Sequence, residues 1–214
     1  MKPANDLTID YKSLVDRGYD LCAGAYDEAR KNQAGTELNS LTTRLRDGVA
    51  VLDVGCGAGV PYTRALAQPF DVTGVDSSRE MIQRASANVP LGRFIHGHIM
   101  SVAFPPASFN AAVAFYSVFH LPKEEHPELF HRIYHWLQPV NLFCTLSRLN
   151  EEAYTEDDVF GVTMYWSNYG LDDYEDILTR VAFGLLECSV VGHGYRAAHQ
   201  STSEQHPLVL AQKQ

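Results

Sequence analysis

Short apolar runs alternate with amphipathic stretches over most of the chain. Continuous aliphatic runs predict five strands, at residues 49–54 (VAVLDV), 70–76, 92–97, 109–116 and 141–149. Helical spacing predicts helices at residues 60–67, 78–87 and 124–137, the first with Pro61 in its first turn, where a missing N–H is tolerated. Strands that alternate with helices at this spacing predict right-handed crossovers and a doubly wound, mostly parallel sheet.

The two ends of the chain depart from this alternation. Residues 8–46 carry helix-like apolar spacing, in two stretches of which the second ends at Gly48, and we interpret residues 1–47 as an N-terminal helical cap. Residues 151–170 are acidic and then aromatic, and we interpret them as a lid-like insertion before a helix near 171–181. Residues 184–194 and 206–213 predict two final strands that pair as a hairpin. The whole chain, 1–214, is expected to form a single domain.

Composition narrows the classes of function. The 214 residues carry a net charge of −9, which argues against a nucleic-acid surface, and 45% hydrophobic residues indicate a globular chain. The start lacks a signal-peptide pattern, and no apolar run is long enough to cross a membrane. The four cysteines form no C-x-x-C pair and fit reduced thiols. We therefore expect a cytoplasmic location and a small-molecule partner rather than a nucleic acid or a membrane.

The turn after the first predicted strand is the richest motif. It reads D-x-G-x-G-x-G and comprises Asp53, Gly55, Gly57 and Gly59. The dinucleotide fingerprint needs glycine where Val60 stands, and a second carboxylate, Asp76, ends the next strand, where ribose hydroxyls are usually bound. Two carboxylates favour a nucleoside ligand that carries an ammonium group and no diphosphate, which fits S-adenosylmethionine. The alternative is a tight strand-to-helix connection without a ligand.

With these motifs the chain resembles the class I S-adenosylmethionine-dependent methyltransferases of small molecules. The resemblance rests on VLDVGCGAG, VTGVDSS, FPPASFNAAVAFYSVFHL and HWLQP, and covers residues 15–149 best. It implies a Rossmann-like, seven-stranded sheet with an antiparallel C-terminal strand. It also implies how S-adenosylmethionine is held. The methionine end is bound by Asp53, Gly55, Cys56, Gly57 and Gly59, the ribose by Asp76, and the adenine is bordered by Ser77 and Met81. The backbone of Tyr116 borders the cofactor, and Tyr19 and Tyr26 belong to an N-terminal segment that closes over it. For both tyrosines the alternative is packing of an N-terminal helix.

Three positions depart from the family pattern. His98 stands where the family commonly has an aspartate that accepts from the adenine amino group. A neutral imidazole is expected to accept one hydrogen bond there, and the Ile99 amide to donate to the ring. Asn110 replaces a frequent aspartate, and Val140 and Asn141 replace two glycines, which we interpret as structural drift.

Methyl transfer needs alignment of the acceptor and, for a hydroxyl acceptor, a base. His120 follows the fourth predicted strand and is the candidate base, because its ordinary pKa suits neutral pH. The alternative is a histidine that caps the next helix or fills the edge of the sheet. Tyr165, Trp166 and Tyr169 are candidates for the substrate wall, against ordinary packing of the insertion. The expected role of His193, Tyr195 and His199 is as solvated loop residues.

No metal site is expected. His131 and His135 have the i, i+4 spacing of a helical metal pair, with His126 nearby. Their helix should bury its apolar face on the sheet and turn both side chains outward or sideways. The sequence has no glutamate in an H-E-x-x-H arrangement there, and no third ligand is evident.

The sequence therefore predicts methyl transfer to oxygen, nitrogen or carbon of a small molecule. Two alternatives stay open: the same fold used as a cyclase or isomerase, and a non-catalytic binding protein with a weakened cofactor site. The acceptor molecule, the use of a general base and the oligomeric state are not specified by the sequence.

Overall fold

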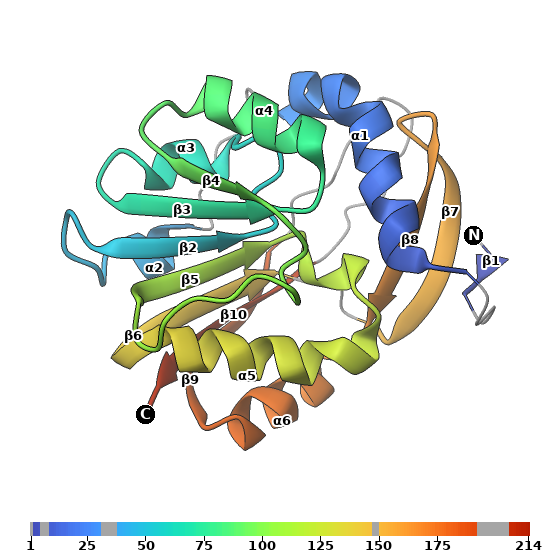
Figure 1. Cartoon of the computed structure of the whole chain (residues 1–214). Coiled ribbons are helices and arrows are strands. Elements are labelled where there is room, and N and C mark those ends of the chain that lie inside the picture. Colours follow the sequence, from blue (N-terminus) through green and yellow to red (C-terminus); the bar gives the residue numbers. More distant parts are fainter. Residues whose placement is uncertain (1, 5–8, 31–37, 147–149, 192–205) are drawn as a thin grey trace.

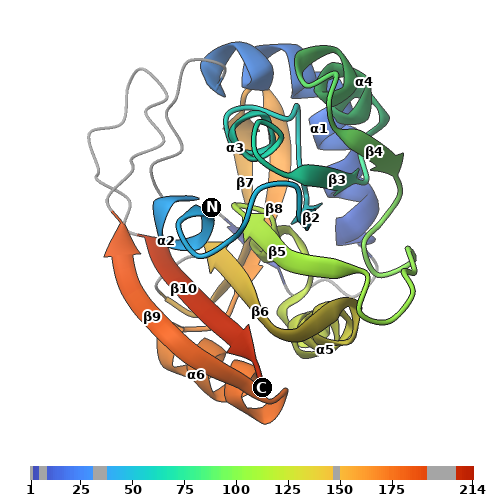
Figure 2. The same ribbon diagram turned by 90° about the vertical axis from the view of Figure 1, so that its left-hand side faces the viewer.

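A seven-stranded sheet forms the centre of the computed structural model, which describes residues 2–4, 9–30, 38–146, 150–191 and 206–214. The strand order is β4-β3-β2-β5-β6-β10-β9, and the first five strands run parallel (Figures 1 and 2). Strand β10 runs antiparallel to both of its neighbours, β6 and β9. The strands are β2 (Ala50–Val54), β3 (Asp71–Asp76), β4 (Arg93–His96), β5 (Phe109–Phe115), β6 (Leu137–Leu146), β9 (Phe183–Val191) and β10 (His206–Lys213). The predicted fold class and the final hairpin are confirmed.

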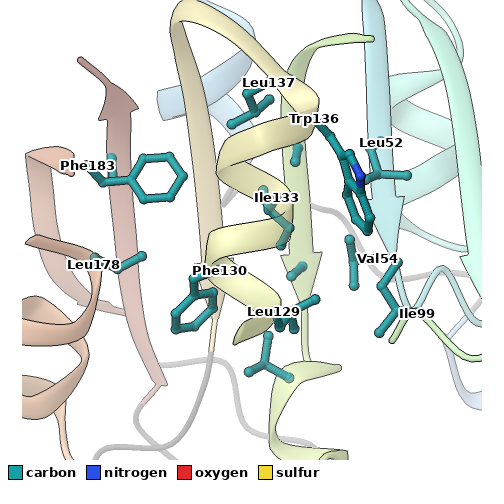
Figure 3. Close-up of a cluster of buried hydrophobic side chains, with 14 of the residues drawn as sticks. Leu52, Val54, Ile99, Leu129, Phe130, Ile133, Trp136, Leu137, Leu178 and Phe183 are labelled. Atoms are coloured by element: carbon teal, nitrogen blue, oxygen red, sulfur yellow. The ribbon is translucent and has the colours of Figure 1, made fainter. Parts of the chain in front are cut away.

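Helices cover both faces of this sheet, so its central strands are apolar on both sides. Along β2, Leu52 and Val54 pack toward one layer and Val51 toward the other. The first layer contains α5 (His126–Trp136) and α6 (Leu171–Arg180), whose side chains form the core drawn in Figure 3. The second contains α2 (Asn39–Thr42) and α3 (Tyr62–Leu66). This sandwich leaves the carboxyl ends of the parallel strands as the edge where a ligand site is expected.

A second, smaller sheet stands beside that edge. It contains β1 (Lys2–Pro3), β7 (Glu152–Val159) and β8 (Val162–Asn168), all antiparallel. Residues 151–170, predicted as a lid-like insertion, are thus mostly a hairpin, with Phe160 and Gly161 of the turn and Asp158 at the end of β7 at positive φ. The hairpin packs against α1 (Tyr11–Arg30), where a Cβ on Gly18 would lie 3.0 Å from the Met164 sulfur (Figure 1). The insertion therefore packs against α1 and supports it.

Two predicted boundaries were wrong. The second N-terminal helix was expected to run to Gly48, but α2 is one turn long and the chain continues as turns. At its end the Thr43 hydroxyl bonds back to the Asn39 carbonyl (2.8 Å), which weakens the helix there. Strand β6 begins at Leu137, directly after α5, rather than at 141. Val140 and Asn141 consequently lie within the strand.

The remaining elements complete the crossovers. Helix α4 (Arg79–Asn88) begins at Ser78, whose hydroxyl accepts the Met81 N–H (3.1 Å). Two 3-10 turns, η2 (Val118–His120) and η3 (Lys123–Glu125), join β5 to α5. Among the helices that the structure describes, none is both long and apolar enough to cross a membrane.

Candidate functional site

A cavity lies at the carboxyl ends of β2, β3 and β5, and residues of α1 form part of its wall. Helix α1 contributes residues from both ends, from Lys12 to Arg30. Thirteen of the sequence-predicted site residues line this cavity: Tyr19, Tyr26, Asp53, Gly55, Cys56, Gly57, Asp76, Ser77, Met81, His98, Ile99, Tyr116 and His120.

The glycine turn after β2 is shaped by close contacts. Gly55 has φ +72°, and a Cβ there would lie 2.3 Å from the Ser117 Cβ, so only glycine allows β2 and β5 to end side by side. Ser117 also donates its hydroxyl to the Val54 carbonyl (2.6 Å). Gly57 has φ +54°, and the nearest atom to its absent Cβ is on the Tyr26 ring, 3.8 Å away. A side chain at Gly57 would enter the cavity.

Gly59 has a different role from its neighbours. It was predicted to hold the cofactor, but it is not part of the cavity lining. A Cβ at this position would meet Val89 at 3.0 Å and Ala85 at 3.2 Å. The third glycine therefore permits close packing of the turn against α4.

The carboxylate of Asp76 is held by the backbone on both sides. It accepts the Gly57 N–H at 2.8 Å and the Ser78 N–H at 2.9 Å. Burial raises the pKa of this carboxyl from 3.8 to about 6, and the two amide hydrogen bonds oppose that rise. Asp76 thus joins the glycine turn to the start of α4 at the cavity wall.

Asp53 is the more deeply buried of the two acids, with 3% of its surface exposed. It accepts the Thr63 hydroxyl of α3 at 2.6 Å. Burial raises the pKa of Asp53 to about 7, the Thr63 bond lowers it, and the nearby Asp76 carboxylate raises it further. The two strand tips therefore concentrate negative charge that a cation in the cavity would stabilise.

His98 lies in the loop after β4 and is half-buried. Its Nδ1 accepts the Met100 N–H at 3.3 Å. Burial lowers the pKa of His98, as does Lys12.

Of the other departures from the family pattern, Asn110 lies away from the cavity lining. Its amide donates to Gln138 (3.0 Å) and its oxygen accepts the Ala50 N–H (3.2 Å), so it joins neighbouring strand ends.

His120 is buried and takes part in two hydrogen bonds. Its Nδ1 donates to the Tyr165 carbonyl (2.8 Å), which leaves Nε2 as an acceptor for the Tyr19 hydroxyl (2.7 Å). Of the two expected alternatives, capping of the next helix does not describe this geometry, whereas the buried ring packed against Trp166 and Tyr19 also fits a histidine that fills the edge of the sheet. A carbonyl that fixes the ring and a phenol on its other nitrogen make His120 and Tyr19 a pair able to move a proton.

Arg30 brings a positive charge to the same cavity. It ends α1, is buried, and its guanidinium lies over the rings of Tyr26 (5.2 Å) and Tyr116 (5.3 Å). Sequence reasoning missed Arg30, Lys12 and Asp16. Lys12, Asp16 and Tyr19 recur at i, i+4 and i+7, and this polar spacing on an N-terminal helix could have indicated a face turned toward a site.

The three aromatic residues expected at the substrate wall are not part of the lining. Tyr165 stacks on Tyr11 of α1, with ring centroids 4.3 Å apart. Trp166 packs against the His120 ring at 4.6 Å, behind the cavity wall. Tyr169 lies against Tyr174. Tyr165 and Trp166 thus support α1 and His120 from the hairpin side, whereas Tyr169 packs toward α5 and α6.

The histidines of α5 do not converge. His131 and His135 are exposed, as expected, whereas His126 is buried and bonded to the Tyr174 hydroxyl (3.0 Å) and the Leu121 carbonyl (3.1 Å). No group of three or more metal-ligating side chains occurs within the described ranges. His193, Tyr195 and His199 lie outside the described residues.

Comparison with known proteins identifies the family. Residues 51–140 match the model of the family described as "Methyltransferase domain". Over this span the chain carries a class I S-adenosylmethionine-dependent methyltransferase domain. A curated relative, the sterol 24-C-methyltransferase of Pneumocystis carinii (strain B80), is 26% identical over 210 residues, which cover 90% of this chain and 54% of the relative. The chain thus spans about half the length of that relative.

Solved structures confirm the fold of this methyltransferase domain. The magnesium protoporphyrin IX methyltransferase from Synechocystis PCC 6803 matches with a TM-score of 0.72 and 12% identity, covering 98% of this chain and 100% of that one. The [4+2]-cyclase SpnF matches with a TM-score of 0.70 and 18% identity, covering 92% and 94%. The same fold therefore occurs in a methyltransferase and in a cyclase.

The cavity of the methyltransferase domain fits S-adenosylmethionine in the chemistry of its side chains. The Asp53 and Asp76 carboxylates suit an ammonium group and ribose hydroxyls, the Arg30 guanidinium suits a carboxylate, and Gly57 leaves room for a ligand beside the backbone. A ligand with both charges and a sugar thus finds a partner for each.

Replacing Gly57 by leucine should test this cradle. We expect Gly57→Leu to weaken binding of S-adenosylhomocysteine at least about tenfold in calorimetry, because the side chain enters the cavity. Gly48→Leu is the matched control, since Gly48 has φ +77° and nothing within 4 Å of a Cβ. Both variants carry similar backbone strain, so equal losses of affinity would contradict the assignment of the Gly57 turn to ligand binding.

Ligand binding should also depend on pH. Both carboxyls have folded-state pKa values above their ordinary 3.8, so their burial costs the free protein stability as pH rises from about 4 to about 7. A cationic ligand favours the ionised forms, so affinity should rise between pH about 5.5 and 8, with protons released on binding. Calorimetry at pH 6 in two buffers of different ionisation enthalpy measures this release, and Asp76→Asn should diminish it. A pH-independent affinity would contradict the assignment.

Proposed function

We propose that this chain transfers a methyl group from S-adenosylmethionine to a small-molecule acceptor. The observation that carries the proposal is the cavity in which the buried Asp53 carboxylate, the half-buried Asp76 carboxylate, the open glycine turn and a histidine–tyrosine pair come together. The family match and the curated methyltransferase relative favour methyl transfer over other uses of the fold.

In this proposal the turn and the strand tips bind and orient the cofactor. Asp76 accepts the ribose hydroxyls, Asp53 and the turn from Gly55 to Gly57 hold the methionine end, and Arg30 faces its carboxylate. The cofactor, when bound, supplies a methyl group already activated by positive sulfur. Because the cofactor brings the reactive carbon, the protein contributes alignment, exclusion of water and removal of a proton.

The proton of the acceptor is taken up by the Tyr19–His120 pair. As the acceptor's proton passes to the Tyr19 oxygen, the phenol's own proton moves to His120 Nε2 over the 2.7 Å hydrogen bond. The Tyr165 carbonyl, bonded to Nδ1, stabilises the imidazolium that forms. A proton lost from a methylated carbon follows the same path, so the pair serves oxygen and carbon acceptors alike.

Product analysis tests the function directly. Incubation with methyl-labelled S-adenosylmethionine and a panel of phenols, sterols and other isoprenoids is expected to give labelled product and an equal amount of S-adenosylhomocysteine. Cofactor binding with a rearranged, unlabelled product would instead support a cyclase or isomerase. No binding at millimolar cofactor would contradict both enzyme functions and leave a binding protein.

Substitutions of Tyr19 and His120 should slow turnover without abolishing cofactor binding. We expect His120→Ala and Tyr19→Phe each to lower kcat about 10²–10⁴-fold, and the double variant to lose little more, because the two residues act as one unit. Cofactor affinity should change less than about threefold in calorimetry. Tyr134→Phe, which removes a hydroxyl bonded far from the cavity to the Gln214 carbonyl, is the control. Additive losses, or unchanged rates, would remove the pair from the mechanism.

A further inference from the structure

The hydrogen bonds around His98, a residue of the cavity lining, indicate which nitrogen of its ring carries the proton. The loop after β4 folds back on this residue, because the His98 carbonyl accepts the N–H groups of Ser101 (2.8 Å) and Val102 (3.1 Å). The ring then turns its Nδ1 toward the same loop, where it accepts the Met100 N–H (3.3 Å). Nε2 is on the opposite edge of this ring, away from the amide that Nδ1 accepts.

The surroundings keep this ring neutral at pH 7. Burial lowers the pKa of His98, and the Lys12 ammonium of α1 lowers it further. The carboxylates of Asp16 in α1, Glu125 in η3 and Asp10 just before α1 act in the opposite direction and raise the pKa, but they do not reverse the shift. A neutral imidazole whose Nδ1 accepts a hydrogen bond carries its one proton on Nε2.

The loop containing His98 lies beside the strand tip assigned to the ribose. The Gly97 N–H donates to the Asp76 carbonyl (2.9 Å), so residues 97–99 continue the cavity wall directly from Asp76. A sugar whose hydroxyls bind Asp76 therefore places its base over this loop. This step rests on the proposed cofactor site.

We propose that His98 recognises the purine of the cofactor as a hydrogen-bond donor, through Nε2–H to a ring nitrogen of the base. A donor cannot pair with the exocyclic amino group, which is itself a donor, but it pairs with the acceptors N1, N3 or N7. An aspartate at this position would do the reverse and accept from the amino group. His98 thus selects for ring nitrogens and is indifferent to the amino group.

Binding of base analogues tests this specificity. Calorimetry compares S-adenosylhomocysteine with its 6-deamino analogue and its 1-, 3- and 7-deaza analogues, on the whole chain and on His98→Asp. In the unaltered protein the deamino analogue should bind within about threefold of the parent, and one deaza analogue should lose about tenfold or more. In His98→Asp the pattern should reverse at this position, with a loss for the deamino analogue and no penalty for the deaza analogue that lacks the nitrogen paired with His98. A deaza penalty that comes from the expected Ile99 N–H bond should be the same in both proteins.

The opposite pattern in the unaltered protein, a tenfold loss for the deamino analogue and none for any deaza analogue, overturns the proposal. So does a set of analogues that all bind alike. Failure of S-adenosylhomocysteine itself to bind overturns the proposed function, and the base assignment with it. The two failures are therefore distinguishable.

Nitrogen NMR of the ligand-free protein supplies a readout that needs no cofactor. With labelled histidine, the signals that disappear in His98→Asn should show a neutral ring protonated at Nε2. His120 is the internal control, because its Nδ1 donates to the Tyr165 carbonyl and its signals should show the other tautomer. A His98 ring protonated at Nδ1 overturns the proposal whatever the binding data show.

Discussion

The arrangement of the site depends on one carboxylate that accepts two backbone amides. Asp76 bonds the N–H groups of Gly57 and Ser78, and so fixes the glycine turn after β2 against the start of α4 after β3. Two adjacent parallel strands thereby end in one rigid frame around the cavity. The same hydrogen bonds keep the half-buried acid from losing its charge altogether, since they oppose the effect of burial on its pKa.

Helix α1 completes the wall of the cavity by contacts with the start of α4, with η3 and with η2. Asp20 accepts the Ser78 hydroxyl (2.6 Å), Lys12 bonds Glu125 (2.7 Å), and Tyr19 bonds His120. The proposed proton path includes Tyr19 and therefore exists only while α1 lies in this position. The polar face of the helix thus links closure of the cavity to the chemistry proposed inside it.

The fold could be predicted from the sequence because its signals are local. The apolar run of β2, the hydroxyl cap at Ser78 and the alternation of strands and helices each follow from neighbouring residues. The carboxylates of Asp53 and Asp76 could be placed at the cavity for the same reason, since parallel strand ends share an edge. What could not be predicted depends on distant contacts. Arg30 reaches the cavity only because α1 crosses the sheet edge, and Trp166 lies behind His120 only because the hairpin supports that helix.

The close approach of Gly18 to Met164 bears on how molecules reach the interior. On the hairpin side α1 is joined by apolar packing and by the stacked rings of Tyr11 and Tyr165. On the α4 side Ala23 and Met81 share a small apolar cluster, and polar bonds of Asp20 and Asp27 supply the other contacts. Water replaces hydrogen bonds readily but does not replace apolar contacts. The contact between α1 and α4 should therefore separate first. Helix α1 and the hairpin would then move outward together and open an entrance to the cavity beside Asp76.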